Sequence, residues 1–258
     1  MGRVGALLYG VVCYLIFVAT FVYAVGFVTN LIVPRSIDAP PSASLGYALV
    51  VNILLLGVFA LQHSGMARHG FKKAWTRFVP EPLERSTYVL FTCVALLLLF
   101  WQWEPIGGVV WEVESPTGRA VLTALSLMGF GMVLISTFLI NHFDLFGLRQ
   151  VYLYACNEEY RPLGFRTPAL YNLVRHPIYL GFLIAFWAAP TMTVAHFVFA
   201  VMTAGYILVA IQLEERDLLR VYGSTYQSYR HRVSMLLPLP RRADAPETAT
   251  KRQRVTIG

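Results

Sequence analysis

The chain has 258 residues, of which 57% are hydrophobic and only 14% are charged. Soluble domains carry about a quarter charged residues, so this composition excludes an ordinary soluble fold. The net charge of +7 does not indicate a nucleic-acid partner, because the basic residues fall between apolar runs and in the C-terminal tail. Basic residues in such places set the orientation of a membrane protein, and we therefore expect a lipid bilayer around this chain.

Four apolar runs are long enough to cross a bilayer, which takes about 20 mostly apolar residues. They extend from Val4 to Val33, from Leu45 to His63, from Ser86 to Trp103 and from Ala120 to Ile140. A further uncharged stretch, from Pro177 to Leu213, is too long for one span, and Pro190 favours a break inside it. The sequence thus predicts an all-α polytopic integral membrane bundle that ends in a helical hairpin with a short first arm.

Three regions follow from this pattern. Residues 1–140 are predicted to form a four-helix transmembrane core. Residues 141–237 are predicted to form a second region that contains the hairpin, and the polar residues 238–258 are predicted to form a disordered tail.

The connections between the runs differ in charge. The connection from Arg68 to Arg85 is rich in Lys and Arg, whereas the one after the third run carries Glu104, Glu112 and Glu114. The positive-inside rule therefore predicts that both termini lie in the cytoplasm. Polar clusters that are far apart in sequence would then meet at the cytoplasmic ends of the helices.

The densest polar cluster is the segment 171–181, Tyr-Asn-Leu-Val-Arg-His-Pro-Ile-Tyr-Leu-Gly. Pro177 suits the first turn of a helix, so His176 is expected at a helix start, where backbone N–H groups favour an anion. Arg175 would add a charged donor. The alternative is that Arg175 and His176 only mark the lipid–water boundary. Two tyrosines offer flat faces to an adenine or to a sulfonium cation: Tyr171 and Tyr179.

A second cluster closes the hairpin. A carboxylate at the mouth of an apolar hairpin is costly to desolvate unless it has a partner, and Glu214 is the candidate, with Arg175 or a ribose as that partner. For Glu215, Arg216 and Asp217 the sequence favours the solvated side of a helix.

Two histidines at helix ends, His63 and His142, are candidate bases or interfacial residues. They share one expected depth with Gln62, Ser64 and Asn141. We expect no metal site, because neither an H-x-x-x-H spacing nor a carboxylate–histidine pair accompanies them.

The segment 173–181, the apolar hairpin, Glu214-Glu215 and the Tyr-Gly-x-x-Tyr-x-x-Tyr run from Tyr222 to Tyr229 together resemble the isoprenylcysteine carboxyl methyltransferase superfamily. This resemblance covers about residues 160–237. Nearly the whole chain is similar to one bacterial branch of it, the methanethiol S-methyltransferases, which are grouped with NnrU-like membrane proteins. The segments that carry this second resemblance are 62–68, 84–88, 141–150 and 162–168.

The resemblance implies S-adenosylmethionine as the methyl donor, and it implies that residues 141–237 form the catalytic subdomain that binds this donor. The positions that it implies for cofactor binding are Leu163, Gly164, Phe165, Arg166, Tyr171, His176, Pro177, Tyr179 and Glu214. The eukaryotic relatives have an arginine one turn before the glutamate, where this chain has Ala210. This difference disfavours a carboxylate acceptor and favours a small, neutral thiol.

The resemblance implies methylation of methanethiol to dimethyl sulfide in the bacterial cytoplasmic (inner) membrane, with no obligate protein partner evident. His142, ranked first, and His63 are the candidate bases, and Arg175 is the candidate stabiliser of the thiolate. Two alternatives stay open: another acceptor, such as hydrogen sulfide, a larger thiol or an isoprenoid, and a non-enzymatic haem-binding NnrU-like protein.

Overall fold

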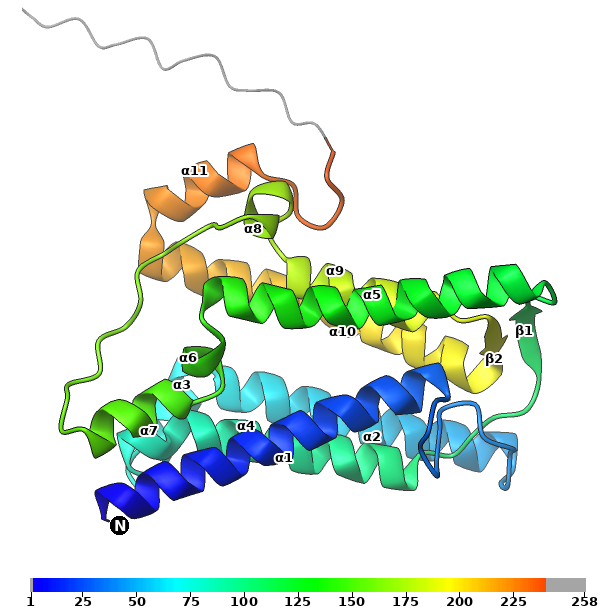
Figure 1. The fold of residues 1–258 in the computed structure, drawn as a ribbon, viewed down its shortest axis with the longest axis horizontal. Helices are drawn as coiled ribbons and strands as arrows, with labels where there is room; N and C mark the ends of the chain where they lie inside the picture. The colour runs from blue at the N-terminus through cyan, green and yellow to red at the C-terminus, as the bar shows by residue number, and fades with distance from the viewer. Residues whose placement is uncertain (1, 240–258) are drawn as a thin grey trace, which may run out of the picture.

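The structure is a computed structural model, and it describes residues 2–239. Within this range, five helices are long and apolar enough to cross a membrane: α1 (Arg3–Thr29), α2 (Leu45–Ala67), α4 (Glu81–Gln102), α5 (Pro116–Ile140) and α10 (Val194–Tyr222). The first four of them correspond to the four predicted runs. The prediction of an all-α polytopic membrane bundle is therefore confirmed (Figure 1).

Shorter elements connect these spans. The helices are α3 (His69–Trp75), α6 (His142–Leu145), α7 (Leu148–Ala155), α8 (Leu170–Leu173), α9 (Pro177–Trp187) and α11 (Ser224–Arg232). Two strands, β1 (Val109–Glu112) and β2 (Thr191–Thr193), pair antiparallel with Glu112 opposite Thr191. This small sheet ties the α4–α5 connection to the turn of the hairpin.

The helices form two packed groups (Figure 1). Helix α4 packs between α1 and α2, and α7 covers α1 and α4, while α9 packs along α5 and also contacts α10. The groups meet in an aromatic core in which Phe27, Phe100 and Trp103 are buried together with Phe130 and Phe199. The predicted division at residue 140 stays a prediction, and the predicted tail lies, from residue 240 onward, outside the described residues.

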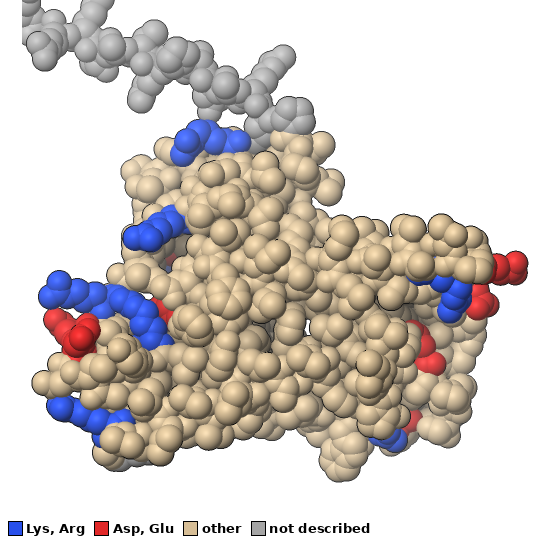
Figure 2. Space-filling model, in the orientation of Figure 1, with Lys and Arg blue, Asp and Glu red and all other residues tan. Residues whose placement is uncertain are grey.

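The two ends of the bundle differ in charge (Figure 2). We call the end with the Arg68–Arg85 connection the basic end, and the end with Glu104, Glu112 and Glu114 the acidic end. Helix α1 begins at the basic end, and α11 lies there too (Figure 1). The beginning of α1 and the end of the described chain are therefore on the same side of the bundle.

The hairpin has the predicted asymmetry. Helix α9 has 11 residues, a length of about 16 Å at 1.5 Å per residue, whereas a bilayer core is about 30 Å thick. The chain leaves the helix at Ala188, passes Pro190 and re-enters helix at Val194. The Thr193 hydroxyl caps α10 by accepting a hydrogen bond of 3.1 Å from the His196 amide.

Helix α9 is fixed against α5 by two glycines that let the backbones touch. A Cβ atom added at Gly129 would lie 2.6 Å from Ala185 N and Gly181 O, and one at Gly181 would lie 2.7 Å from Gly129 O. Close approach of this kind is how helices associate where there is no water to drive them together. The Ser126 hydroxyl adds a hydrogen bond of 2.8 Å to the Ala185 carbonyl.

We expect Gly129→Ala to destabilise the protein by about 1–3 kcal/mol, the usual cost of overpacking. The added methyl group would push α9, and with it the start of that helix, away from α5. The measurement is thermal unfolding in detergent. Gly131→Ala on the same helix is the matched control, because a Cβ there meets nothing within 4 Å. Equal melting temperatures for the two variants would contradict the expectation.

Candidate functional site

Four polar side chains from three segments converge at the basic end. The Glu214 carboxylate lies 3.8 Å from Nδ1 of His176, and the Tyr179 phenol faces the same carboxylate. Tyr171 is also close to it: burial, followed by the charge of Glu214, raises the pKa of its phenol above the usual range. The Glu214 side chain remains 45% exposed, so this carboxylate is open to a ligand. We call Tyr171, His176, Tyr179 and Glu214 the Glu214 cluster.

The start of α9 has the predicted geometry. His176 is the N-cap residue and Pro177 occupies the first turn. The preceding backbone is held by the chain that follows α11, because the Arg175 amide donates to Ser234 O at 2.8 Å and the His176 amide donates to Met235 O at 3.2 Å. The N-terminus of α9 is therefore fixed by both the α5 glycine contact and this C-terminal strap, residues 233–235.

Glu215 is the main correction to the sequence prediction. It does not face solvent but is 2% exposed. Its carboxylate accepts from Arg175 Nε at 2.8 Å and His176 Nε2 at 3.1 Å, and it pairs with Arg230 Nε at 3.1 Å. The buried charge has so many partners because an unpaired one would be costly. Arg216 is exposed, and Asp217 pairs with Arg68 at 2.8 Å.

This arrangement also determines the proton position on His176. A carboxylate only accepts hydrogen bonds, so Nε2 of His176 carries the proton that points at Glu215. In the neutral ring, Nδ1 then carries no proton, and this is the nitrogen that faces Glu214.

Arg175 lies in the same network rather than in the open part of the site. Its guanidinium contacts Glu215 through Nε and through Nη2, the latter at 2.7 Å. Its Nη1 donates to Val233 O at 2.7 Å and to Arg230 O at 3.2 Å. Every guanidinium nitrogen therefore has a protein partner, and the side chain joins the start of α9 to α10, to the end of α11 and to the strap.

The segment from Leu163 to Arg166 lies over α11 and the end of α10. The Phe165 ring is 5.2–5.7 Å from three tyrosine rings, those of Tyr222, Tyr226 and Tyr229. Leu163 is half-buried, whereas Gly164 and Arg166 are exposed. The Tyr229 hydroxyl donates to Tyr171 O at 2.6 Å, which connects this aromatic cluster to the Glu214 cluster.

His142 is 2% exposed and has partners on both ring nitrogens. Asn141, in the left-handed conformation at φ 119°, ends α5 and caps α6, and this turn folds His142 back toward Thr137. Nδ1 lies 2.7 Å from Thr137 Oγ1, and Nε2 lies 2.9 Å from Tyr14 Oη. The ring also stacks on Phe138 with centroids 4.1 Å apart.

The Thr137 hydroxyl donates to Leu134 O at 2.6 Å, so its oxygen accepts from Nδ1 of His142. The neutral ring then has its proton on Nδ1, and Nε2 accepts from the Tyr14 hydroxyl. Burial lowers the pKa of His142 below its usual value, so the ring is neutral at pH 7.

His63 lies in a second group of hydroxyls, which includes residues that sequence reasoning missed. Its ring is 3.0 Å from Tyr88 Oη and stacks on Phe59. The neighbouring Ser64 Oγ lies 2.9 Å from Tyr206 Oη. The Tyr88 and Tyr206 phenols are both within electrostatic reach of the Tyr179 hydroxyl. The sequence did not single out Tyr14 and Tyr206, because each is an isolated tyrosine within an apolar run. The only signal for either residue was a hydroxyl inside a segment expected to lie in the membrane.

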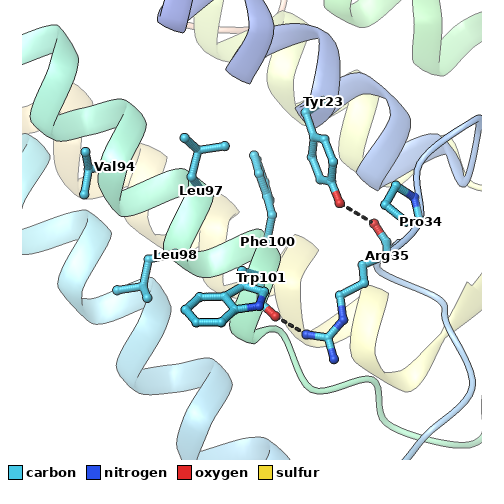
Figure 3. A pocket seen from close by; sticks show the side chains of 8 residues that line it. All are labelled: Tyr23, Pro34, Arg35, Val94, Leu97, Leu98, Phe100 and Trp101. Carbon is cyan, nitrogen blue, oxygen red and sulfur yellow. Dashed lines mark hydrogen bonds between the residues drawn. The ribbon is translucent and has the colours of Figure 1, made fainter.

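An apolar groove of about 760 Å³ lies elsewhere, at the acidic end of α1 and α4 (Figure 3). It is lined by Tyr23, Pro34, Arg35, Val94, Leu97, Leu98, Phe100 and Trp101. The Arg35 guanidinium donates to the Trp101 carbonyl, and the Tyr23 hydroxyl donates to Arg35 O at 3.3 Å. The groove contains none of the predicted site residues, so it is separate from the Glu214 cluster.

Comparison with known proteins finds two kinds of relative. The chain is 56% identical over 238 residues to methanethiol S-methyltransferase from Crocosphaera subtropica, covering 92% of this chain and 93% of that protein. It is also 56% identical over 242 residues to methanethiol S-methyltransferase from Mycobacterium tuberculosis, covering 94% and 99%. Nurim from Mus musculus is 31% identical over 199 residues, covering 72% and 74%. No family model and no solved structure matches the chain.

Proposed function

Because this chain belongs to the methanethiol S-methyltransferase family, we propose that it transfers a methyl group from S-adenosylmethionine to methanethiol, which gives dimethyl sulfide. The observation that carries the proposal is the Glu214 cluster, in which an open carboxylate, two tyrosines and the start of α9 share one place. The proposal would fail if these groups served only to mark the membrane boundary.

The donor set of the cluster fits the chemical groups of this methyl donor. Glu214 can accept hydrogen bonds from ribose hydroxyls, and the faces of Tyr171 and Tyr179 suit an adenine ring or a cation. The first amides of α9 suit a carboxylate. The segment from Leu163 to Arg166 is proposed to cover the ligand, because Phe165 holds it over α11. When bound, the donor supplies a methyl group on a positively charged sulfur.

The transfer is one displacement. The thiol sulfur forms a bond to the methyl carbon as the bond from that carbon to the sulfonium sulfur breaks, the electron pair stays on the leaving sulfur, and the thiol proton passes to a base. Free thiols have pKa values of about 8.5 or above, so a base or a stabilising partner is needed at pH 7. His142 and His63 are the proposed bases. Arg175 is proposed to act through position, because its nitrogens already bind Glu215, Arg230 and Val233.

A small neutral acceptor also suits the membrane setting. The face of α10 that carries Tyr206 and Glu214 has only the short side chain of Ala210 between them, so this face of the helix does not itself supply a cation to a carboxylate acceptor. We propose that the basic end lies on the cytoplasmic side of the bacterial inner membrane. The charged donor would then enter from water, while methanethiol would reach the site through lipid.

The decisive experiment uses the detergent-purified full chain. Calorimetry with S-adenosylhomocysteine should show binding that Glu214→Gln weakens, and headspace analysis should detect dimethyl sulfide from methanethiol and S-adenosylmethionine. Ethanethiol, hydrogen sulfide and a prenylated cysteine in the same assay test the alternative acceptors. A protein that binds haem, with a Soret band, and does not bind S-adenosylhomocysteine would overturn the proposal.

A further inference from the structure

We call His63, Ser64, Tyr88 and Tyr206 the hydroxyl cluster. This cluster lies inside the bundle, beyond the Glu214 cluster. Tyr206 precedes Glu214 by eight residues on α10, about 12 Å along the helix axis at 1.5 Å per residue. Since α10 runs toward the basic end, Tyr206 lies deeper in the apolar part of the bundle than Glu214. Polar side chains at such depth are costly and usually serve a function.

Four helices bring hydroxyls to this place. Ser64 on α2 binds Tyr206 on α10 at 2.9 Å, and Tyr88 on α4 binds His63 at 3.0 Å. Tyr179 on α9 lies within electrostatic reach of both Tyr88 and Tyr206, and its hydroxyl also faces Glu214. Tyr179 is therefore within electrostatic reach of both sets of side chains, and Tyr206 and Glu214 lie on the same face of α10.

The direction from which the acceptor must approach gives the hydroxyl cluster a role. An acceptor sulfur must approach the methyl carbon from the side opposite to the leaving sulfur. If the charged donor enters from the basic end and is held at Glu214, the open side of its methyl group faces deeper into the bundle. The hydroxyls met there are those of Tyr179, Tyr206 and Tyr88.

We propose that the Tyr206 hydroxyl binds the sulfur of a small thiol acceptor and stabilises it as the thiolate, with Ser64 holding that hydroxyl in place. A Ser64 hydroxyl that donates to Tyr206 leaves the Tyr206 proton free for the sulfur. Hydrogen bonds to charged groups contribute more than those between neutral groups, so the contact favours the ionised thiol. The cation of Arg68, which is paired with Asp217 at 2.8 Å, is also within electrostatic reach of Tyr206. This inference rests on the proposed function.

The test is Tyr206→Phe in the full chain, with Tyr47→Phe as the matched control, since Tyr47 is 58% exposed at the start of α2. We expect kcat/KM for methanethiol to fall about tenfold or more, as for loss of a hydrogen bond to a charged group. The rising limb of the pH–rate profile should move to higher pH by about one unit, because a tenfold loss of thiolate stabilisation corresponds to that shift. The affinity for S-adenosylhomocysteine should stay within about twofold of wild type.

Each other outcome has a distinct meaning. If Tyr206→Phe matches Tyr47→Phe in both rate and pH profile, the assignment of Tyr206 is wrong. The same holds if the affinity for S-adenosylhomocysteine falls as much as the rate, because the hydroxyl would then not act on the acceptor. If the wild type itself forms no dimethyl sulfide, the proposed function fails and not only this inference.

Discussion

Replacing Glu215 by glutamine should unfold the basic end of the protein at a much lower temperature, whereas the same change at Glu214 should leave the fold intact. The neighbouring carboxylates differ in surroundings: Glu215 is 2% exposed, and the Glu214 side chain is 45% exposed. The first has a structural role and the second is proposed to bind the cofactor.

The size of the Glu215 effect follows from its partners. Glutamine would leave the buried Arg175 without its counter-charge and would also remove the partner of the more exposed Arg230. Breaking a buried ion pair by removing one member costs about 3–5 kcal/mol. Arg175, without its counter-charge, would hold the strap less firmly through Nη1 and Val233 O. The start of α9 would then depend on its glycine contact with α5 and on the two backbone hydrogen bonds to the strap.

Thermal unfolding in detergent, paired with calorimetry on S-adenosylhomocysteine, separates the two roles. Glu215→Gln should lower both the melting temperature and the affinity. Glu214→Gln should keep the melting temperature and lose about tenfold in affinity, as for one lost hydrogen bond to a charged acceptor. Arg216→Gln, at an exposed position, is the control. A stable Glu215→Gln protein with normal affinity would show that the buried network does not hold the site.

The second large effect concerns the base. His142→Ala should reduce turnover by about 10²–10⁴-fold, the usual contribution of a general base, while binding of S-adenosylhomocysteine persists. The tautomer supports the assignment, because Nε2 has no proton and faces the Tyr14 hydroxyl.

The pH dependence gives an independent check. Burial lowers the pKa of His142 below 6.5, so the ring stays neutral, and able to accept a proton, down to that lowered value. Activity that depends on it should be lost only as the pH falls through a point below 6.5, and His142→Ala should remove that acid limb. His63→Ala is the parallel variant. If both variants keep near-normal turnover, no histidine acts as base, and positioning of the reactants must supply the rate.

The spans and the hairpin could be predicted from the sequence, because a bilayer restricts which segments can cross it. Length and the absence of charge identified the first four spans, since an unpaired charge or backbone group in lipid is too costly to occur by chance. Pro177 and Pro190 indicated where the hairpin starts and breaks, because proline cannot continue a helix from within. Of the two partners expected for Glu214, Arg175 pairs with Glu215 instead, and the ribose stays a prediction.

The roles within the site depended on tertiary structure. Sequence spacing could not distinguish Glu215 from its exposed neighbour Arg216, because burial depends on which side of α10 meets Arg175, His176 and the returning strap. It could not reveal Tyr14 or Tyr206 either, since a hydroxyl in an apolar run gains meaning only from the partner that another helix supplies. Chain pattern determines which segments enter the membrane, whereas the charge and proton positions of the site arise from contacts between residues as far apart as Tyr14 and His142.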